Sequence, residues 1–283
     1  MEAGIAIVVM VAALFHAIWN AAVKSGNDPL LSITDINVAT FLIALPLVPV
    51  VGLPHPDSWP FLITSAVLHF GYYLALSEAY KYGDFSQAYP IARGTAPVIV
   101  TLWGTLVLAE TLSAVELVSL AGVLSGLLIF TSQTFPRVMR DRKALVAALV
   151  TSIFIGGYTL ADGVGGRLSQ NIPGYMVWLY LLDGIPVLIY AVCRRGLHEV
   201  AGIRHDWKLM FAGAGFAFVS YALVVWAMSR APIPLVSALR ETSIVIAALI
   251  GAFYFKESSS QRRITASVVI FSSVALLALG GSG

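Results

Sequence analysis

Charge and cysteine are both scarce in this sequence. Asp, Glu, Lys and Arg make up only 11% of the 283 residues, whereas soluble domains carry about 25% charged residues. Hydrophobic residues make up 58%, and the mean hydropathy is +0.85. Because so few charges cannot cover a soluble surface, the composition excludes a disordered chain, a basic nucleic-acid-binding protein and an ordinary cytosolic enzyme. The single cysteine, Cys193, excludes an internal disulfide and a metal site built from several cysteines.

Long apolar runs are what the sequence contains instead. A membrane-spanning helix needs about 20 mostly apolar residues, and ten runs of this kind are separated by short breaks rich in Pro, Gly, Asp or basic residues. The sequence therefore predicts an all-α polytopic membrane protein with ten transmembrane helices. The predicted spans are Gly4–Lys24, Leu31–Gly52, Trp59–Lys81, Ser86–Ala109, Ala114–Ser132, Ala144–Val164, Pro173–Cys193, Trp207–Ser229, Pro234–Phe255 and Gln261–Gly280.

Lysine and arginine are distributed unevenly among the loops. When the loops are numbered along the chain, the odd-numbered loops hold 13 of these residues and the even-numbered loops hold 2, Arg167 and Arg230. Cytoplasmic loops of membrane proteins are enriched in Lys and Arg. We therefore expect the odd loops to be cytoplasmic and both termini to be periplasmic, with the chain in a bacterial inner membrane.

Polar landmarks recur at a fixed spacing along the chain. Arg93 and Arg240 lie inside predicted spans and are 147 residues apart, and Glu110 and Glu257 are separated by the same distance. Further pairs are Thr95 with Thr242, at the same spacing, and Phe15 with Phe154 and Trp19 with Tyr158, at a spacing of 139. The pairs indicate an internal repeat with five spans in each half.

An odd number of spans per repeat has a geometric consequence. The second copy must enter the membrane upside down relative to the first, which is the inverted-topology repeat of many secondary transporters. We predict a first five-helix repeat at residues 1–134, a basic cytoplasmic linker at residues 135–143 and a second repeat at residues 144–283. The substrate site of such a protein is expected near the membrane midplane, between the two repeats.

The chain resembles a ten-helix member of the drug/metabolite transporter superfamily, of the EamA type. The features that carry the resemblance are the two five-helix halves, Trp19-Asn20 with Lys24 closing the first helix, and a Glu followed by a polar turn at Glu110 and Glu257. The second half departs from the family pattern at Lys256-Glu257, where a Gly-Glu pair is common. The resemblance implies transport of a small metabolite without ATP hydrolysis.

One stretch in the fourth predicted span is similar to a narrower group within this superfamily. Residues 88–97, with the sequence Ala-Tyr-Pro-Ile-Ala-Arg-Gly-Thr-Ala-Pro, resemble a subgroup associated with phosphonate utilisation. Tyr89 of this stretch is included among the predicted substrate-binding residues. Pro90 and Pro97 flank Arg93 and are expected to break the helical hydrogen-bond ladder there.

Arg93 and Arg240 are the strongest functional candidates. A charge at the centre of a spanning helix costs about 2.5–3.5 kcal/mol on insertion scales, so intramembrane charges usually have a function. The functional interpretation is a bidentate clamp on a carboxylate or phosphonate of the substrate. The structural interpretation is an ion pair or carbonyl clamp that ties helices together. Glu241 follows Arg240 directly, but adjacent residues point about 100° apart on a helix, so we expect the two side chains not to share a face closely.

Aromatic and polar side chains at span centres complete the predicted substrate site. Its expected residues are Arg93, Arg240, Trp19, Asn20, His69, Tyr73, Tyr89 and Tyr158. Proton-coupling candidates are His16, His69 and Glu241, because histidine titrates near neutrality and carboxylates relay protons in transporters. An interhelical hydrogen bond is the structural alternative for both histidines.

Other functions fit the sequence less well. An aromatic-cage exporter of amphipathic or cationic compounds would use Trp19, Tyr73 and Tyr158. Two arginines in the same cavity oppose a cation unless Glu241 and Glu78 neutralise them. Asp162 and Asp183 resemble an intramembrane protease pair, although the Gly-x-Gly-Asp motif of those enzymes is absent. We therefore expect no enzyme activity.

The expected partners follow from this reading of the sequence. They are a small-molecule substrate and the lipid bilayer, with no nucleic acid, metal or cofactor. The oligomeric state stays open between a monomer and a homodimer. Gly122 and Gly126 indicate a close helix contact that lies either inside one chain or between two protomers.

Overall fold

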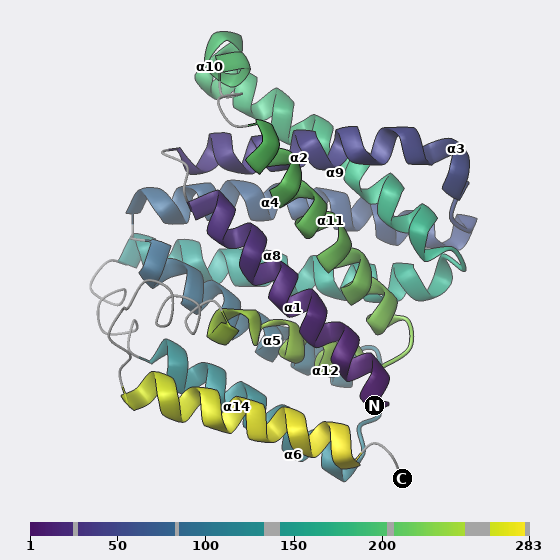
Figure 1. The fold of residues 1–283 in the computed structure, drawn as a ribbon, viewed down its shortest axis with the longest axis vertical. Coiled ribbons are helices and arrows are strands. Elements are labelled where there is room, and N and C mark those ends of the chain that lie inside the picture. The colour runs from purple at the N-terminus through teal and green to yellow at the C-terminus, as the bar shows by residue number, and fades with distance from the viewer. Residues whose placement is uncertain (25–27, 83–84, 133–141, 203–206, 247–260, 281–283) are drawn as a thin grey trace.

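The computed structural model describes residues 1–24, 28–82, 85–132, 142–202, 207–246 and 261–280, and this part of the chain is helical (Figure 1). The first half contains α1 (Ala3–Lys24), α2 (Pro29–Ala44), η1 (Leu45–Leu47), α3 (Val48–Val51), η2 (Pro56–Ser58), α4 (Trp59–Tyr82), α5 (Phe85–Leu106) and α6 (Ala114–Thr131). The second half contains α8 (Arg142–Leu168), α9 (Ile172–Arg195), α10 (Leu197–Gly202), α11 (Trp207–Met228), α12 (Ile233–Arg240) and α14 (Gln261–Gly280).

The helices have the length and composition of membrane spans. Seven segments within the described ranges are long and apolar enough to cross a bilayer: Leu30–Val51, Pro56–Glu78, Ala114–Thr131, Arg142–Leu168, Ile172–Arg195, Met210–Met228 and Gln261–Gly280. Large apolar side chains such as Val50, Leu106 and Leu279 are exposed on the outside of the bundle. In water these side chains would be costly, whereas lipid tails solvate them. The predicted all-α polytopic membrane protein is confirmed.

Short polar sequences fix where individual helices begin and end. The Asp28 side chain accepts hydrogen bonds from two amides in the first turn of α2 and caps that helix. Ser113 and Glu116 form a reciprocal capping box at the start of α6. Gly196 ends α9 with a φ of 86°, a backbone conformation that favours glycine.

The ninth predicted span is interrupted, which corrects the expectation of one continuous helix over Pro234–Phe255. Helix α12 ends at Arg240, Glu241 and Thr242 form a turn, and helical backbone resumes over residues 243–246. The Thr242 amide bonds to the carbonyl of Leu239, three residues back, and this tightens the backbone away from the regular α-helical pattern. Helix α5 continues through Pro90 and Pro97, from Phe85 to Leu106, so the missing proline donors do not end the helix. Residues 247–255 of the ninth span lie outside the described residues.

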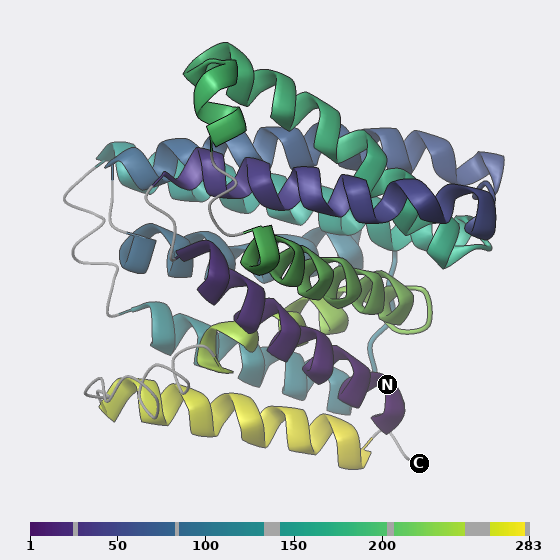
Figure 2. The ribbon, with the colours of Figure 1, turned by 45° about the horizontal axis from the view of Figure 1, so that its top comes forward.

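The helices of the two halves pair with pseudo-two-fold symmetry. Helix α1 packs on α11 and α4 packs on α8, while α2 contacts α9, α5 contacts α12 and α6 contacts α14. By their order in each half, the equivalent helices are α1 and α8, α2 and α9, α4 and α11, α5 and α12, and α6 and α14. Exchanging equivalents turns the α1–α11 pair into the α8–α4 pair and leaves each of the other three pairs unchanged. The α6–α14 pair forms one edge of the bundle (Figures 1 and 2).

The equivalent helices α2 and α9 run antiparallel, as an inverted repeat requires. At one end of the α2–α9 pair, Asp28 lies 2.7 Å from Arg195. At the other end, Asn171 at the start of α9 donates a 2.7 Å hydrogen bond to the carbonyl of Val51, at the end of α3. The start of α2 therefore meets the end of α9, and the two equivalent spans cross the membrane in opposite directions.

The glycine pair of α6 makes its close contact within the chain. A Cβ atom on Gly126 would lie 3.1 Å from the carbonyl oxygen of Ala266 and would clash with Ile270, both on α14. A Cβ atom on Gly122 would meet Ser273 of the same helix. Of the two alternatives that the sequence left open for this pair, the structure therefore supports the contact inside one chain.

The even-numbered loops are connected to one another at one end of the bundle. Arg167, at the end of α8, contacts the Glu110 carboxylate at 2.5 Å and donates a 2.9 Å hydrogen bond to the Ala231 carbonyl. The backbone amide of His55 donates a 3.0 Å hydrogen bond to the carbonyl of Ser169. Arg167 and Ser169 belong to loop 6, so these bonds join loops 2, 4 and 8 to loop 6, and all four even loops lie on the same face.

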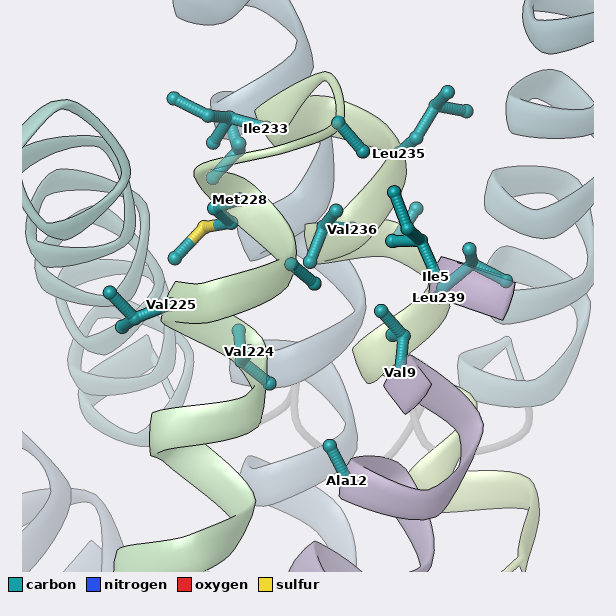
Figure 3. Close-up of a cluster of buried hydrophobic side chains, with 14 of the residues drawn as sticks. Ile5, Val9, Ala12, Val224, Val225, Met228, Ile233, Leu235, Val236 and Leu239 are labelled. Carbon is teal, nitrogen blue, oxygen red and sulfur yellow. The ribbon is translucent and has the colours of Figure 1, made fainter. Parts of the chain in front are cut away.

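An apolar cluster holds α12 in place between the halves. Figure 3 shows Val9 of α1, Val224 and Met228 of α11, and Val236 and Leu239 of α12 packed together. Each of these side chains is almost completely buried. Burial of one such aliphatic side chain contributes about 1.5–3 kcal/mol relative to exposure. This packing fixes the end of α12, where Arg240 is located.

Candidate functional site

A cavity of about 100 Å³ lies between helices of the two halves. Its walls contain two arginines, one carboxylate, two histidines, one tryptophan and five tyrosines, with a few small polar and apolar side chains. The lining residues are His16, Trp19, Ile33, Ile36, Asn37, Thr40, His69, Tyr72, Tyr73, Leu76, Arg93, Tyr158, Tyr180, Asp183, Ala217, Tyr221 and Arg240.

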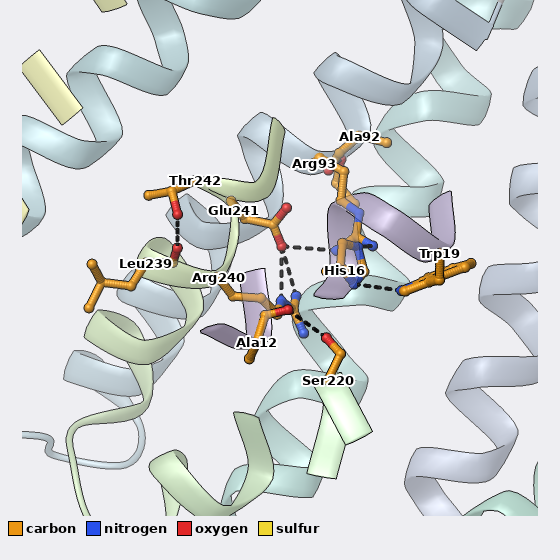
Figure 4. Close-up of polar contacts among 11 residues, drawn as sticks. Ala12, His16, Trp19, Ala92, Arg93, Ser220, Leu239, Arg240, Glu241 and Thr242 are labelled. Atoms are coloured by element: carbon orange, nitrogen blue, oxygen red, sulfur yellow. Dashed lines mark hydrogen bonds and ion pairs between the residues drawn. The ribbon is translucent and has the colours of Figure 1, made fainter. Parts of the chain in front are cut away.

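Arg93, Arg240 and Glu241 form one buried ionic cluster, which we call the arginine–glutamate cluster (Figure 4). Arg93 donates from Nη1 to Glu241 Oε1 at 3.0 Å. Arg240 donates to the same oxygen from Nε at 3.1 Å and from Nη2 at 2.9 Å. The exposed fractions of the three side chains are only 3%, 2% and 0%, so lipid and bulk water do not reach the cluster.

The contact between Arg240 and Glu241 corrects the expectation that they would not share a face. That expectation assumed a continuous helix with about 100° between successive side chains. Because α12 ends at Arg240, the turn at Glu241 aims its carboxylate back at the guanidinium. Arg93 of α5 therefore forms a buried ion pair with the turn after α12, as the structural interpretation expects, whereas Arg240 pairs with its own sequence neighbour. Both arginines also line the cavity.

His16 connects the cluster to Trp19. Arg93 Nη2 contacts His16 Nε2, and the Trp19 indole Nε1 lies 3.1 Å from His16 Nδ1. Both partners are donors only, and a neutral imidazole accepts on just one of its nitrogens. A protonated His16 would place N–H groups against both donors. A second proton, which would make His16 an imidazolium, is therefore compatible with the site only when these contacts open.

His69 belongs to an aromatic wall on the other helices. Its ring stacks on Tyr158 with centroids 3.9 Å apart and 16° between the planes. Tyr73 and Tyr221 lie near the same ring, at centroid distances of 6.2 and 5.7 Å. His69 Nδ1 lies 3.1 Å from the carbonyl of Ser65, one turn earlier on the same helix, so this contact lies within α4 and is not the expected interhelical bond.

Two aspartates come from α8 and α9. Asp162 accepts a 2.9 Å hydrogen bond from the Tyr175 hydroxyl and a second from the Tyr221 hydroxyl, and it does not line the cavity. Asp183 does line the cavity, and its Oδ2 lies 3.8 Å from His69 Nδ1. The two residues therefore differ in environment: one carboxylate is satisfied by tyrosines, and the other faces the cavity.

The structure brings most of the predicted site residues together. The predicted residues that line the cavity are His16, Trp19, His69, Tyr73, Arg93, Tyr158 and Arg240. Glu241 lies behind the two arginines, fully buried. The side chains of Asn20 and Tyr89 lie outside the described part of the chain.

Several lining residues were missed as binding candidates. They are Asn37, Thr40, Tyr72, Tyr180, Asp183 and Tyr221. The sequence contained a signal that could have identified two pairs of these residues. Asn37 and Thr40 are three residues apart, as are Tyr180 and Asp183, so each pair places two polar side chains on one helix face. Asp183 was weighed only as a protease residue, although an intramembrane carboxylate calls for the same functional reading as the arginines.

Comparison with known proteins gives a family and a fold. Residues 3–132 and 142–279 each match the EamA-like transporter family. A Staphylococcus epidermidis protein named for ribose uptake is 24% identical over 261 residues, covering 88% of this chain and 87% of that protein, and its counterpart in a second strain matches equally. A crystal structure described only as that of a protein has a TM-score of 0.74 over 100% of this chain and 99% of that chain, at 17% identity, which shows a shared fold.

Proposed function

Because the chain belongs to the EamA-like transporter family, we propose that it is a secondary-active transporter of a small polar or anionic metabolite. The substrate binds in the cavity between the two inverted repeats, and the site opens alternately to each side of the membrane. The protein catalyses no covalent reaction in this scheme.

The observation that carries the proposal is the convergence of Arg93 and Arg240 on one cavity. They occupy equivalent positions of the two repeats, and both are buried while lining the cavity wall. Guanidinium groups bind carboxylates, phosphates and hydroxyl oxygens through several donors in a fixed plane. A site that draws one arginine from each repeat also has the symmetry that alternating access requires.

Glu241 supplies an internal anion for these donors. Its Oε1 accepts from both arginines, while its Oε2 has no hydrogen-bond partner among the described residues. An anionic or hydroxyl group of the substrate would compete with this carboxylate for the guanidinium donors. Substrate binding is thereby linked to rearrangement of the Glu241 side chain.

The turn after α12 provides a place for that rearrangement. Interrupted spans are where inverted-repeat transporters form their substrate sites, because the irregular backbone lines a polar cavity. Here the interruption lies at Glu241 and Thr242, directly beside the cavity-lining Arg240. The ribose-uptake name of the similar Staphylococcus epidermidis protein supports a small hydroxylated substrate.

An aromatic-cage exporter of cations is the second candidate. The stacked pair His69 and Tyr158, with Tyr73 and Tyr221 beside it, favours this function. Cation–π attraction in such cages amounts to about 0.5–2 kcal/mol. The two guanidiniums oppose a cation only to the extent that Glu241 and Asp183 leave their charge uncompensated.

A ligand panel tests the proposed function against the second candidate. The purified protein is heated with D-ribose, D-ribonate or tetraethylammonium, and the midpoint of thermal unfolding is measured, because a ligand that binds only the folded state raises it. We expect ribose or ribonate to raise the midpoint and to be taken up by proteoliposomes. A response to tetraethylammonium alone would replace the proposal with the cation exporter.

Membrane orientation is a separate expectation. The 13 to 2 division of Lys and Arg between odd and even loops predicts a periplasmic C-terminus in a bacterial inner membrane. Reporter fusions after Gly283 should therefore be active with a periplasmic reporter such as alkaline phosphatase and inactive with a cytoplasmic one. The reverse pattern would show that the loop charges do not set the orientation of this chain.

A further inference from the structure

Asp183 is a buried carboxylate whose hydrogen bonds are missing. Its side chain is 3% exposed and lines the cavity. Within the described residues, Oδ1 has no hydrogen-bond partner, and Oδ2 lies 3.8 Å from His69 Nδ1, beyond hydrogen-bond range. His69 Nδ1 is already within 3.1 Å of the Ser65 carbonyl.

The other buried carboxylates of the described chain have protein partners. Asp162 receives hydrogen bonds from the hydroxyls of Tyr175 and Tyr221. Glu241 receives three from the two arginines. A buried carboxylate without a protein hydrogen bond is unfavourable unless a donor from outside the protein reaches it. Glu241 Oε2 lacks a partner too, but its other oxygen is held by both arginines, whereas neither oxygen of Asp183 has a hydrogen bond among the described residues.

The position of Asp183 indicates where that donor comes from. Asp183 comes from α9 and lies beside His69 of α4, while the arginine–glutamate cluster belongs to α5 and α12. The formal charges of Arg93, Arg240, Glu241 and Asp183 cancel. A substrate that carries an acceptor group for the arginines and a donor group for Asp183 would satisfy both regions at once.

We propose that Asp183 is a second substrate-binding residue, which accepts a hydrogen bond from a hydroxyl or ammonium group of the transported metabolite. The metabolite is thus a small molecule with an acceptor end, anionic or hydroxylated, at the arginine–glutamate cluster and a donor end at Asp183. This inference rests on the proposed function and narrows its substrate class.

The test uses pairs of probes that differ only in their donors. D-ribonate and pentanoate share a five-carbon carboxylate, but only ribonate carries hydroxyls, while glycine and trimethylglycine differ in the N–H donors. Affinity for the full-length protein is measured by titration calorimetry. We expect wild type to prefer the donor-bearing member of one pair, and that pair identifies the donor as hydroxyl or ammonium. Asp183→Asn should reduce the preference about ten- to a hundredfold, the range for a hydrogen bond to a charged group.

The midpoint of thermal unfolding is an independent measurement. It remains informative for a variant that binds none of the probes. Asp183→Leu removes the unpartnered carboxylate, so it should raise the midpoint of thermal unfolding while abolishing the donor preference. Asp162→Asn is the matched control. It breaks satisfied hydrogen bonds and should lower the midpoint, but it should leave the ratio of affinities within each pair unchanged.

Four results would overturn the role of Asp183. The first three are equal affinity of wild type for both members of each pair, a donor preference that survives in Asp183→Asn, and a lower unfolding midpoint in Asp183→Leu. A proton-carrying role would appear as unchanged binding with lost proton-driven uptake, and it too would overturn the proposal. If Arg93→Lys still weakens pentanoate binding in any of these cases, the proposed function stands and only the role of Asp183 fails.

Discussion

Replacing Glu241 with Gln is expected to lower the free energy of unfolding by about 3–5 kcal/mol, the usual effect of removing one partner from a buried ion pair. The carboxylate accepts three hydrogen bonds, at 3.0, 3.1 and 2.9 Å, from two guanidiniums. Gln keeps the size of the side chain but not its charge, so Arg93 and Arg240 would remain as two uncompensated cations, each at most 3% exposed. Equilibrium unfolding in mixed micelles measures the loss.

A solvent-facing ion pair provides the control for the Glu241 substitution. Arg195 contacts Asp28 at 2.7 Å, but the two side chains are 41% and 28% exposed. Exposed pairs contribute about 0–1 kcal/mol because water screens them. Arg195→Gln should therefore change the free energy of unfolding by less than about 1 kcal/mol. Equal effects of the two substitutions would mean that the arginine–glutamate cluster is solvated in the folded protein.

Lysine at Arg93 or Arg240 is expected to weaken substrate affinity by about 1–3 kcal/mol, which corresponds to roughly 5- to 150-fold. Lysine keeps the positive charge but loses the planar fork that holds two acceptors at once. The Arg93 guanidinium contacts both Glu241 and His16, and one ammonium group cannot reproduce that geometry. Calorimetric titration of D-ribonate into folded protein gives the affinity, and thermal unfolding of the same preparation gives the stability.

The double variant separates ligand binding from structural support. Because both arginines act on one ligand and one carboxylate, the effects of Arg93→Lys and Arg240→Lys on affinity should be non-additive by about 0.5–3 kcal/mol. A purely structural role predicts lower unfolding midpoints with unchanged affinity in each single variant. That pattern would remove both arginines from the substrate site.

Apolar length and loop charge, which are local properties, were sufficient for the sequence to predict the class of the protein. The ten runs predicted the polytopic helical fold because each spanning helix satisfies its own backbone hydrogen bonds, whatever its neighbours are. The spacing of 147 residues between Arg93 and Arg240 indicated an internal repeat. Five spans in each copy then predicted that the second copy is inverted, because an odd number of crossings reverses the side on which the next copy begins. Both arginines were identified from the sequence because a charged residue inside a spanning helix is costly and therefore usually has a function.

The partners of these charges were decided by tertiary structure alone. A regular helix would separate the side chains of Arg240 and Glu241. The turn at Glu241 lets its carboxylate reach both arginines, whereas α5 continues through the two prolines at which a break was expected. The different environments of Asp162 and Asp183 depend on tyrosines from α9 and α11 that approach one aspartate and not the other. Such contacts join residues up to 148 positions apart in the chain. Helical periodicity assigns a residue to a face of its own helix, but packing of the two repeats selects what that face meets.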